Sequence, residues 1–426
     1  MNERLLQYIW QFQYFNKEQL QTNCQQPLVI LAPGILNTNQ GPDFLQAKIQ
    51  MGNTVWAGSV ELHIKTSDWF KHGHQNDRHY NQVVLHVVWQ HDIDTNNTVK
   101  QLNNIPVLEL CNVVPKILLT RYENLLCQQG FIACENSIIQ VKNIVWQSWK
   151  ERLLAERLTR KADKILQHLE STMFFWEEVF WCNLAANFGL KVNSEAFEAV
   201  AKSLSINMLA KHRNQIHQLE ALMLGQAGLL NNVHEDKYGM LLQKEYTFLK
   251  QKYNLQAIHA PVYFLRMRPA NFPTIRLAQL AMLVHQSVHL FSIIKEETEL
   301  RKLATLFTVT PNDYWLYHYR FGEATPYKEK HLGKTMFDSI VINTICPILF
   351  AYGIYHNDES IKTKAVSWLL QTKAEANHVV SSYKELGVVS KNAADTQALL
   401  ELKTMYCTPK KCLDCSVGNS ILKSAV

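Results

Sequence analysis

The sequence predicts an α+β fold, with a mixed α/β domain at residues 1–130 and a larger all-α domain at residues 131–426. Two observations support this prediction. Apolar and β-branched runs of strand length recur between residues 27 and 110, whereas helical periodicity dominates from about residue 144 to residue 405. The transition contains no low-complexity linker, so we expect the domains to join through a packed segment within residues 130–143.

Each element of the first domain has its own sequence signal. The apolar residues of segment 2–15 fall on one side of a helix, which predicts an amphipathic helix there. Segment 83–91, VVLHVVWQH, is almost entirely apolar or β-branched, which is typical of a strand buried on both faces. Further strands are predicted near residues 27–32, 44–49, 55–60 and 105–110, with a turn at Gly52-Asn53.

The composition is that of a globular protein, since 47% of the 426 residues are hydrophobic and 19% are charged. The first 15 residues lack the charged and apolar regions of a signal peptide. No apolar run approaches the roughly 18 residues that a membrane-spanning helix needs, so we expect no contact with a membrane. Nine scattered cysteines favour reduced thiols in a cytoplasmic protein.

Charge is distributed unevenly along the chain. Residues 1–115 contain 7 Lys/Arg and 9 Asp/Glu, a net charge of −2, whereas the remainder contains 36 and 28, a net charge of +8. The sequence pI is about 8.7. This mild basicity is compatible with a polyanionic partner such as nucleic acid, although it is not specific for one.

Asp43 and Glu61 are the most informative pair in the chain. Asp43 precedes the first strand of the predicted hairpin, and Glu61 lies on the second, followed at two-residue spacing by His63 and Lys65. Because side chains alternate along a strand, Glu61, His63 and Lys65 share one face, and the hairpin would place Asp43 beside it. These groups together would make a site for a hard cation with acid–base capacity. The alternative is a half-exposed hairpin with solvated acids.

The polar segment 67–80 contains further candidate ligands. His72, His74 and Asp77 follow the hairpin, and a His-x-His pair followed by Asp has ligand chemistry suited to zinc or manganese. We expect these three residues to form the rim of the same site and to position a substrate. The alternative is that the loop histidines are solvated and that His86, on the next strand, is a hydrogen-bonded core residue.

The C-terminal segment YCTPKKCLDCSVGN contains Cys407, Cys412 and Cys415. A Cys-x-x-Cys pair with a third cysteine nearby is typical of a zinc or iron–sulfur site, which requires four ligands. Cys346 or Cys134 would have to supply the fourth ligand from a distant part of the sequence. The alternative is a tight turn that contains buried reduced thiols.

Arg266, Arg268 and Arg276 cluster around two prolines, and the second proline begins a predicted helix. Arginines beside a helix N-terminus suit a phosphate or a carboxylate, so we expect them to bind substrate phosphates. The alternative is that they pair with acids of the helical domain such as Glu220 or Glu245.

Two resemblances follow from these motifs. Pro42-Asp43 and Glu61-Leu62-His63 resemble the PD-(D/E)XK nuclease core, in which the Asp and the Glu hold a divalent ion and a Lys positions the attacking water. Here His63 replaces that Lys, and Lys65 lies two residues further on. Over nearly its full length the chain also resembles an uncharacterised bacterial family of unknown function. The residues that carry this second resemblance include Gly41-Pro42-Asp43-Phe44, Ser67-Asp68-Trp69, the Arg268 to Pro273 tract and Asn343 to Pro347.

The resemblance to the nuclease core implies a nuclease that depends on Mg²⁺ or Mn²⁺ and hydrolyses phosphodiester bonds of DNA or RNA. Asp43 and Glu61 would bind the ion, and His63 or Lys65 would orient or deprotonate the water. Two alternatives remain open. The core is a non-catalytic module that binds nucleic acid or protein, or the protein is a hydrolase of another substrate with a metal site in the His/Asp-rich loop.

Overall fold

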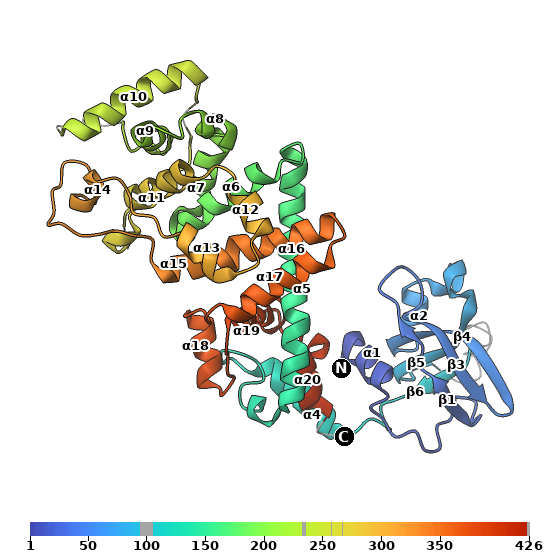
Figure 1. Cartoon of the computed structure of the whole chain (residues 1–426). Helices are drawn as coiled ribbons and strands as arrows, with labels where there is room; N and C mark the ends of the chain where they lie inside the picture. The colour runs from blue at the N-terminus through green and yellow to red at the C-terminus, as the bar shows by residue number, and fades with distance from the viewer. Residues whose placement is uncertain (94–104, 232–235, 257, 266, 424–426) are drawn as a thin grey trace. The chain divides into compact units, whose positions relative to one another are not determined.

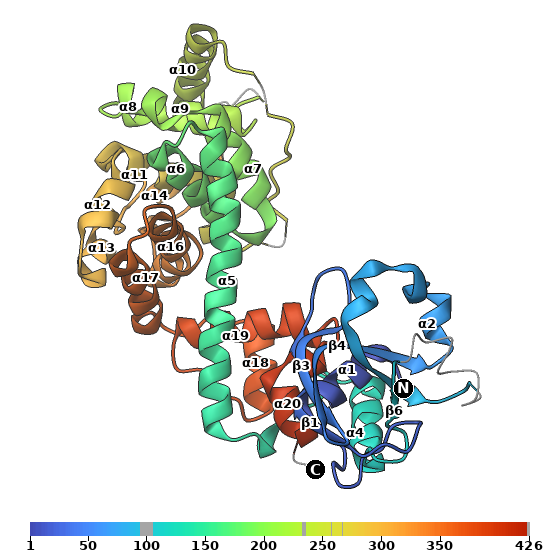
Figure 2. The same ribbon diagram turned by 90° about the vertical axis from the view of Figure 1, so that its right-hand side faces the viewer.

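The computed structural model describes residues 1–93, 105–231, 236–256, 258–265 and 267–423. The chain forms two compact units (Figures 1 and 2). The first unit contains Met1–Trp149 together with Leu402–Val426, and the second contains Lys150–Glu401. The C-terminal segment therefore belongs to the same unit as the strands.

A mixed sheet forms the core of the first unit. In the part of the chain that the structure describes, its strands are β1 (Leu28–Ala32), β2 (Ile35–Leu36), β3 (Phe44–Met51), β4 (Thr54–Lys65), β5 (Val83–Gln90) and β6 (Val107–Glu109). The order across the sheet is β1-β3-β4-β5-β6, and β2 pairs with β3. Strands β1, β3 and β4 are antiparallel neighbours, whereas β4, β5 and β6 are parallel. The predicted strands are therefore present, and β4 lies at the centre of the sheet.

Strands β3 and β4 form the predicted hairpin. Gly52 in the turn has a φ of 56°, a left-handed conformation that glycine adopts without a steric cost. The residues of β4 near the turn are exposed, whereas those from Ser59 to His63 are buried. They are buried because this part of β4 lies between β3 and β5 and contacts both α1 and α2. Strand β5 is mostly buried, as its apolar sequence predicts.

Helix α1 (Glu3–Phe12) packs against β4. The side chain of Asn2 caps this helix by accepting a hydrogen bond from the backbone N–H of Leu5 at 2.8 Å. The apolar residues Leu6, Ile9 and Trp10 are fully buried. The packing brings the amide of Gln7 to the start of β3, where it reaches the functional site described below.

Short helical elements complete the first unit. They are α2 (Asp68–Lys71), η1 (His74–Asn76), η2 (Arg78–Gln82), α4 (Lys116–Cys127), η3 (Ile138–Gln140), η6 (Leu402–Cys407), η7 (Cys412–Asp414) and α20 (Ser416–Lys423). The last three come from the C-terminal segment, and α20 packs against α4, η3 and η7. Helix α5 (Asn143–Ser171) begins in the first unit and continues into the second.

The second unit is helical, as predicted from the periodicity of residues 144–405. Besides most of α5, it contains α6 (Trp176–Phe188), α7 (Leu190–Ser203), α8 (Ile206–Lys211), α9 (Ile216–Gln226), α10 (Lys237–Tyr253), η4 (Pro269–Asn271), α11 (Pro273–Gln286), α12 (Leu290–Glu296), α13 (Leu300–Leu306), α14 (Tyr314–Tyr317), α15 (Lys334–Ile340), η5 (Val341–Ile345), α16 (Cys346–Tyr355), α17 (Glu359–Gln371), α18 (His378–Glu385) and α19 (Ala393–Glu401). Helix α6 packs on α7, α9 on α10 and α11, and α16 on α17. The α+β prediction is therefore confirmed.

One helical stretch, Lys334–Tyr355, is long and apolar enough to cross a membrane by length and composition alone. It comprises α15, η5 and α16. Of its most apolar window, 67% is buried inside the structure. Because most of this window is buried, the helix packs in the interior of the second unit, as apolar core helices of globular proteins do. Helices α11 and α12 are long and apolar enough to cross a membrane only when they are taken together, and the chain bends by 69° between them.

Candidate functional site

Asp43 and Glu61 face each other across the start of the β3–β4 hairpin. The register pairs Phe44 with Val60, so the residues beside them, Asp43 and Glu61, are also close. The backbone N–H of Asp43 donates a hydrogen bond to Glu61 Oε2 at 3.0 Å. The backbone N–H of Leu62 donates in return to Asp43 Oδ2, also at 3.0 Å. These two bonds fix both carboxyl groups on the hairpin.

Burial raises the pKa of both carboxyl groups. For Glu61, desolvation is the main cause, the charge of Asp43 is the second, and the hydrogen bond from Asp43 opposes them. For Asp43, desolvation again dominates, and hydrogen bonds from Leu62 and from the side chain of Gln7 oppose it. The pKa of Glu61 rises further than that of Asp43. Because two buried acids cannot both ionise cheaply, we expect the pair to share a proton at neutral pH.

Three histidines lie close together, and two of them, His63 and His74, lie beside the Glu61 carboxyl. His63 follows on the same face of β4, His72 lies at the C-terminal end of α2, and His74 begins η1. Gly73, between the last two, has a φ of 75°, and this left-handed conformation turns the chain between them. One ligand atom from each of the three histidines lies within 4.8 Å of those from the other two.

The separations within this cluster suit a single metal ion. His63 Nε2 lies 3.0 Å from His72 Nδ1 and 3.7 Å from Glu61 Oε1. His74 Nε2 lies 3.4 Å from Glu61 Oε1. Nitrogen and oxygen ligands of a tetrahedral zinc ion lie about 3.3–3.6 Å from each other. In addition, His74 Nε2 is buried and has no hydrogen-bond partner, which is unusual for a buried nitrogen. We name His63, His72, His74 and Glu61 the histidine cluster.

Neighbouring side chains keep the cluster neutral and oriented. His86 on β5 places its Nε2 2.9 Å from His63 Nδ1, which leaves His63 Nε2 to face the cluster. Burial lowers the pKa of His63 to about 3, with the neighbouring His74 and His72 as further causes. Burial likewise lowers the pKa of His74. Tyr80 stacks on the ring of His74 at 3.9 Å. Neutral imidazoles with fixed tautomers are the form that binds metals.

A family model described as "Protein of unknown function (DUF2851)" matches residues 3–378. The chain belongs to this family. The matched residues include the whole histidine cluster and end before Cys407. No curated protein and no solved structure matches the chain. Family membership therefore supplies no activity, and the chemistry of this DUF2851 protein has to be argued from its own side chains.

Two of the predicted site residues, Lys65 and Asp77, make their hydrogen bonds outside the histidine cluster. Lys65 lies exposed at the end of β4, where its backbone N–H donates to Asp68 Oδ2 at 2.9 Å. Asp77 caps η2 and accepts hydrogen bonds from the backbone and the ring of His79 at 2.9 and 2.7 Å. The contacts of Asp77 therefore belong to the loop, where they shape the turn that follows His74.

Two of the predicted phosphate-binding arginines, Arg268 and Arg276, lie in the second unit. Arg276 is 8% exposed, and its guanidinium donates to Asn271 and Gln279, neither of which is an acid. Burial lowers its pKa to about 10. This buried position suits packing better than contact with a phosphate. Arg268 is exposed just before η4. Arg266 lies outside the described residues.

The candidate acids for those arginines have other partners. Glu220 accepts hydrogen bonds from Tyr238 and Trp315, and Glu245 accepts one from Gln218.

The cysteines that were predicted to bind a metal are divided between the two units. Cys407, Cys412 and Cys415 lie in the first unit with Cys134, whereas Cys346 lies in the second, where Lys161 acts on its pKa.

Sequence reasoning missed one contact of the site. Gln7 donates a hydrogen bond from Nε2 to Asp43 Oδ1 at 2.7 Å. No pattern of residues marks this glutamine, because its role depends on how α1 packs against β4. The sequence indicated His86 only as a candidate core residue. Its position opposite Glu61 in the parallel β4–β5 register explains why it reaches His63.

Proposed function

We propose that this protein is a metal-dependent hydrolase that cleaves phosphodiester bonds of DNA or RNA in the cytoplasm. The observation that carries the proposal is the gathering of His63, His72 and His74 beside Glu61 at ligand-to-ligand distances. Imidazole ligands favour zinc and related transition ions over Mg²⁺. We therefore propose Zn²⁺ or Mn²⁺ for this site.

The residues of the site have separate roles in this proposal. The three histidines and Glu61 hold the ion, and loss of the proton shared by Glu61 and Asp43 accompanies binding. The ion would supply Lewis acidity and lower the pKa of a water molecule. Asp43, which is only half-buried, would accept the proton of that water as the water oxygen attacks phosphorus. The bond from phosphorus to the leaving oxygen would then break, and the proton accepted by Asp43 would pass to that oxygen.

Two features of the chain support a phosphodiester substrate. Asp43 and Glu61 lie side by side on the hairpin, as we expect from the resemblance to the PD-(D/E)XK core, although this proposal gives Asp43 the role of base rather than that of a ligand. Phosphodiester hydrolysis needs a cation near the developing charge. The residues after position 115 have a net charge of +8, which suits a polyanion. A substrate with neutral groups would gain nothing from this charge.

A cleavage assay tests the proposal. Labelled single-stranded and double-stranded DNA and RNA are incubated with the full-length protein in Mn²⁺, in Zn²⁺ and in EDTA. We expect cleavage only with metal, and we expect His74→Ala to reduce it by at least about 100-fold, as loss of a metal ligand should.

His79→Ala is the matched control for His74→Ala, because His79 lies five residues further along the same loop and is 59% exposed at its side chain. It should cleave like the wild type. Equal cleavage by His74→Ala and the wild type would disprove the assigned site. Turnover of a small phosphate ester or an amide without cleavage of any nucleic acid would instead favour a hydrolase of another substrate.

His86→Leu should weaken metal binding without removing a ligand. His63 would lose the partner of Nδ1, and the loss of such a second-shell contact usually costs about 10–100-fold in affinity. The dissociation constant for Mn²⁺ can be measured by calorimetry. His86→Gln, which keeps a hydrogen-bonding group, should bind more tightly than His86→Leu. Equal and unchanged affinities in both variants would show that His86 is only a packing residue.

A further inference from the structure

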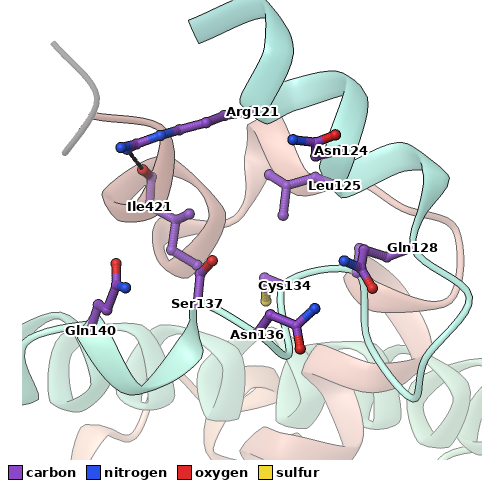
Figure 3. A pocket seen from close by; sticks show the side chains of 10 residues that line it. Arg121, Asn124, Leu125, Gln128, Cys134, Asn136, Ser137, Gln140 and Ile421 are labelled. Carbon is purple, nitrogen blue, oxygen red and sulfur yellow. Dashed lines mark hydrogen bonds between the residues drawn. The ribbon is translucent and has the colours of Figure 1, made fainter. Parts of the chain in front are cut away.

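One face of α4 lines a pocket in the first unit (Figure 3). Arg121, Asn124 and Gln128 are spaced at i, i+3 and i+7 along α4 and its C-cap, so their side chains project from the same face of the helix. Leu125 contributes an apolar surface to this wall. The pocket has a volume of about 210 Å³.

The opposite wall comes from the segment that leads into η3. Asn136, Ser137 and Gln140 face α4 across the pocket (Figure 3). The backbone N–H of Ser137 donates to the carbonyl oxygen of Cys134 at 3.0 Å, and that of Gln140 donates to the carbonyl oxygen of Ser137 at 3.2 Å. Ser137 is the N-cap of η3, but its hydroxyl makes no capping hydrogen bond. The backbone therefore holds this turn, and the polar side chains are left to line the pocket.

Most of the polar side chains in the pocket are uncharged. They offer both hydrogen-bond donors and acceptors, and none of them bonds to another side chain or to the backbone in the part of the chain that the structure describes. These side chains are those of Asn124, Gln128, Asn136, Ser137 and Gln140. Amides and hydroxyls in such a hollow bond to water, and a ligand that supplies the same bonds can replace that water.

Arg121 is the one charged residue among the described residues that line the pocket. It forms no ion pair with a carboxylate of the described ranges. Its Nη1 donates instead to the carbonyl oxygen of Ile421 at 3.3 Å, a length at which the bond is weak. The guanidinium keeps further N–H groups for a ligand. A single guanidinium favours a ligand with one negative charge, and its planar fork matches a carboxylate.

The C-terminal end of α4 does not oppose an anion. The carbonyl end of a helix carries partial negative charge, and Gln128 is the C-cap of α4. The ammonium group of Lys410 donates hydrogen bonds to the carbonyl oxygens of Leu126 and Gln128. These bonds offset the charge of the helix end.

We infer that this pocket binds a compact organic carboxylate that also carries an amide or a hydroxyl group. Arg121 binds the carboxylate, and the uncharged side chains bind the other polar group. The volume is below the roughly 300–1,000 Å³ of pockets for drug-sized molecules, so the ligand is about as large as an amino acid. A free amino acid fits less well, because no carboxylate among the described lining residues can pair with its ammonium group. The inference goes beyond the proposed hydrolase activity and does not depend on the histidine cluster.

The ligand also connects two distant parts of the chain. Ile421 lines the pocket from α20, which packs against α4. A ligand that binds only the folded arrangement stabilises it. Bound carboxylate should therefore slow hydrogen exchange of the α20 backbone.

Calorimetry on the full-length protein tests the inference. The protein is first stripped of metal, so that no carboxylate can bind through an ion at the histidine cluster. The probe is succinamate, which has a carboxylate at one end and an amide at the other. Succinamide replaces the carboxylate with a second amide, and butyrate replaces the amide with a methyl group. We expect succinamate to bind at least about 10-fold more tightly than succinamide, because a hydrogen bond to a charged group is lost. We also expect it to bind more tightly than butyrate.

Arg121→Gln removes the charge but keeps a donor for Ile421, and it should bind succinamate no more tightly than succinamide. Lys116→Gln is the matched control, because Lys116 is an exposed cation of the same helix that does not line the pocket. It should bind like the wild type. Asn136→Leu changes an exposed side chain, so it should fold normally and bind succinamate several-fold more weakly.

Two outcomes would overturn the inference. One is the absence of saturable succinamate binding to the wild type, and the other is equal binding by Arg121→Gln and the wild type. Hydrogen exchange of residues 416–423 with succinamate gives a second measurement, in which Arg121→Gln should show no slowing. Cleavage of nucleic acid enters none of these measurements, so failure of the proposed hydrolase activity would leave their outcome unchanged.

Discussion

Replacing Glu61 with Gln is expected to stabilise the metal-free protein and to remove its response to metal. Glu61 is only 5% exposed, and burial is the main cause that raises the pKa of its carboxyl, followed by the charge of Asp43. Gln has nearly the same shape and keeps an oxygen that accepts the Asp43 N–H, but it cannot ionise. The substitution therefore removes the cost of burying a charge, and it also removes the carboxylate that we propose as the anionic metal ligand.

The stabilising effect of Glu61→Gln should depend on pH. In the unfolded chain the carboxyl ionises near its ordinary pKa of about 4.3, whereas the folded protein keeps the proton to higher pH. The folded state then binds more protons than the unfolded state, so the wild-type free energy of unfolding falls as the pH rises from that value toward the raised pKa. One pKa unit corresponds to about 1.4 kcal/mol. We expect an advantage of at least that order for the variant at pH 8 in EDTA, shrinking toward pH 5.

Urea unfolding with and without Mn²⁺ measures both effects. Mn²⁺ is the better probe because thiolate sites favour softer ions. At 100 times its dissociation constant, a bound ion should stabilise the wild type by about 2.7 kcal/mol, and Glu61→Gln should gain little. Asp77→Asn, at a carboxyl that contacts only its own loop, should behave like the wild type. The assignment of Glu61 would be contradicted if Glu61→Gln were less stable than the wild type in EDTA at pH 8. It would also be contradicted if Mn²⁺ stabilised Glu61→Gln as much as it stabilises the wild type.

The sequence predicted the residues of the histidine cluster as two separate sets, one on a strand and one in the loop that follows. The two-residue spacing places Glu61 and His63 on one face of a strand, and the polar loop supplies His72 and His74. Local periodicity suffices for these residues because they lie within 14 positions of each other on one hairpin and the loop that follows it. The sequence also predicted the strands of the first unit, because each strand has a continuous apolar or an alternating pattern.

Other features depend on packing between distant segments, and no local pattern encodes them. Gln7 reaches Asp43 only because α1 packs against the sheet. Cys134 was one of two candidates for a fourth thiol ligand, and only the return of the C-terminal segment to the first unit separates it from Cys346. The same return places residues 402–426 with the strands, whereas the sequence predicted one boundary near residue 130 and a helical remainder.

Asp43→Asn should remove most of the turnover while leaving metal binding close to that of the wild type. Both oxygens of Asp43 already accept hydrogen bonds, from Leu62 and Gln7. Asn can keep both contacts if Gln7 turns its amide over, so the hairpin should remain folded. General acid–base catalysis contributes about 100–10,000-fold. We expect kcat to fall by at least about 100-fold, and the Mn²⁺ dissociation constant to change by less than about 10-fold.

The resemblance to the nuclease core makes the opposite prediction, because there the Asp is a metal ligand. If Mn²⁺ affinity and turnover fall together in Asp43→Asn, Asp43 binds the ion and the histidine cluster describes only part of the site. Gln7→Leu separates the two roles further. The hydrogen bond from Gln7 lowers the pKa of Asp43, so its loss should raise that pKa and move the acid limb of the pH–rate profile to higher pH. An unmoved acid limb with unchanged kcat would exclude Asp43 as the base, and the proton acceptor would then have to be sought among the groups that hold the ion.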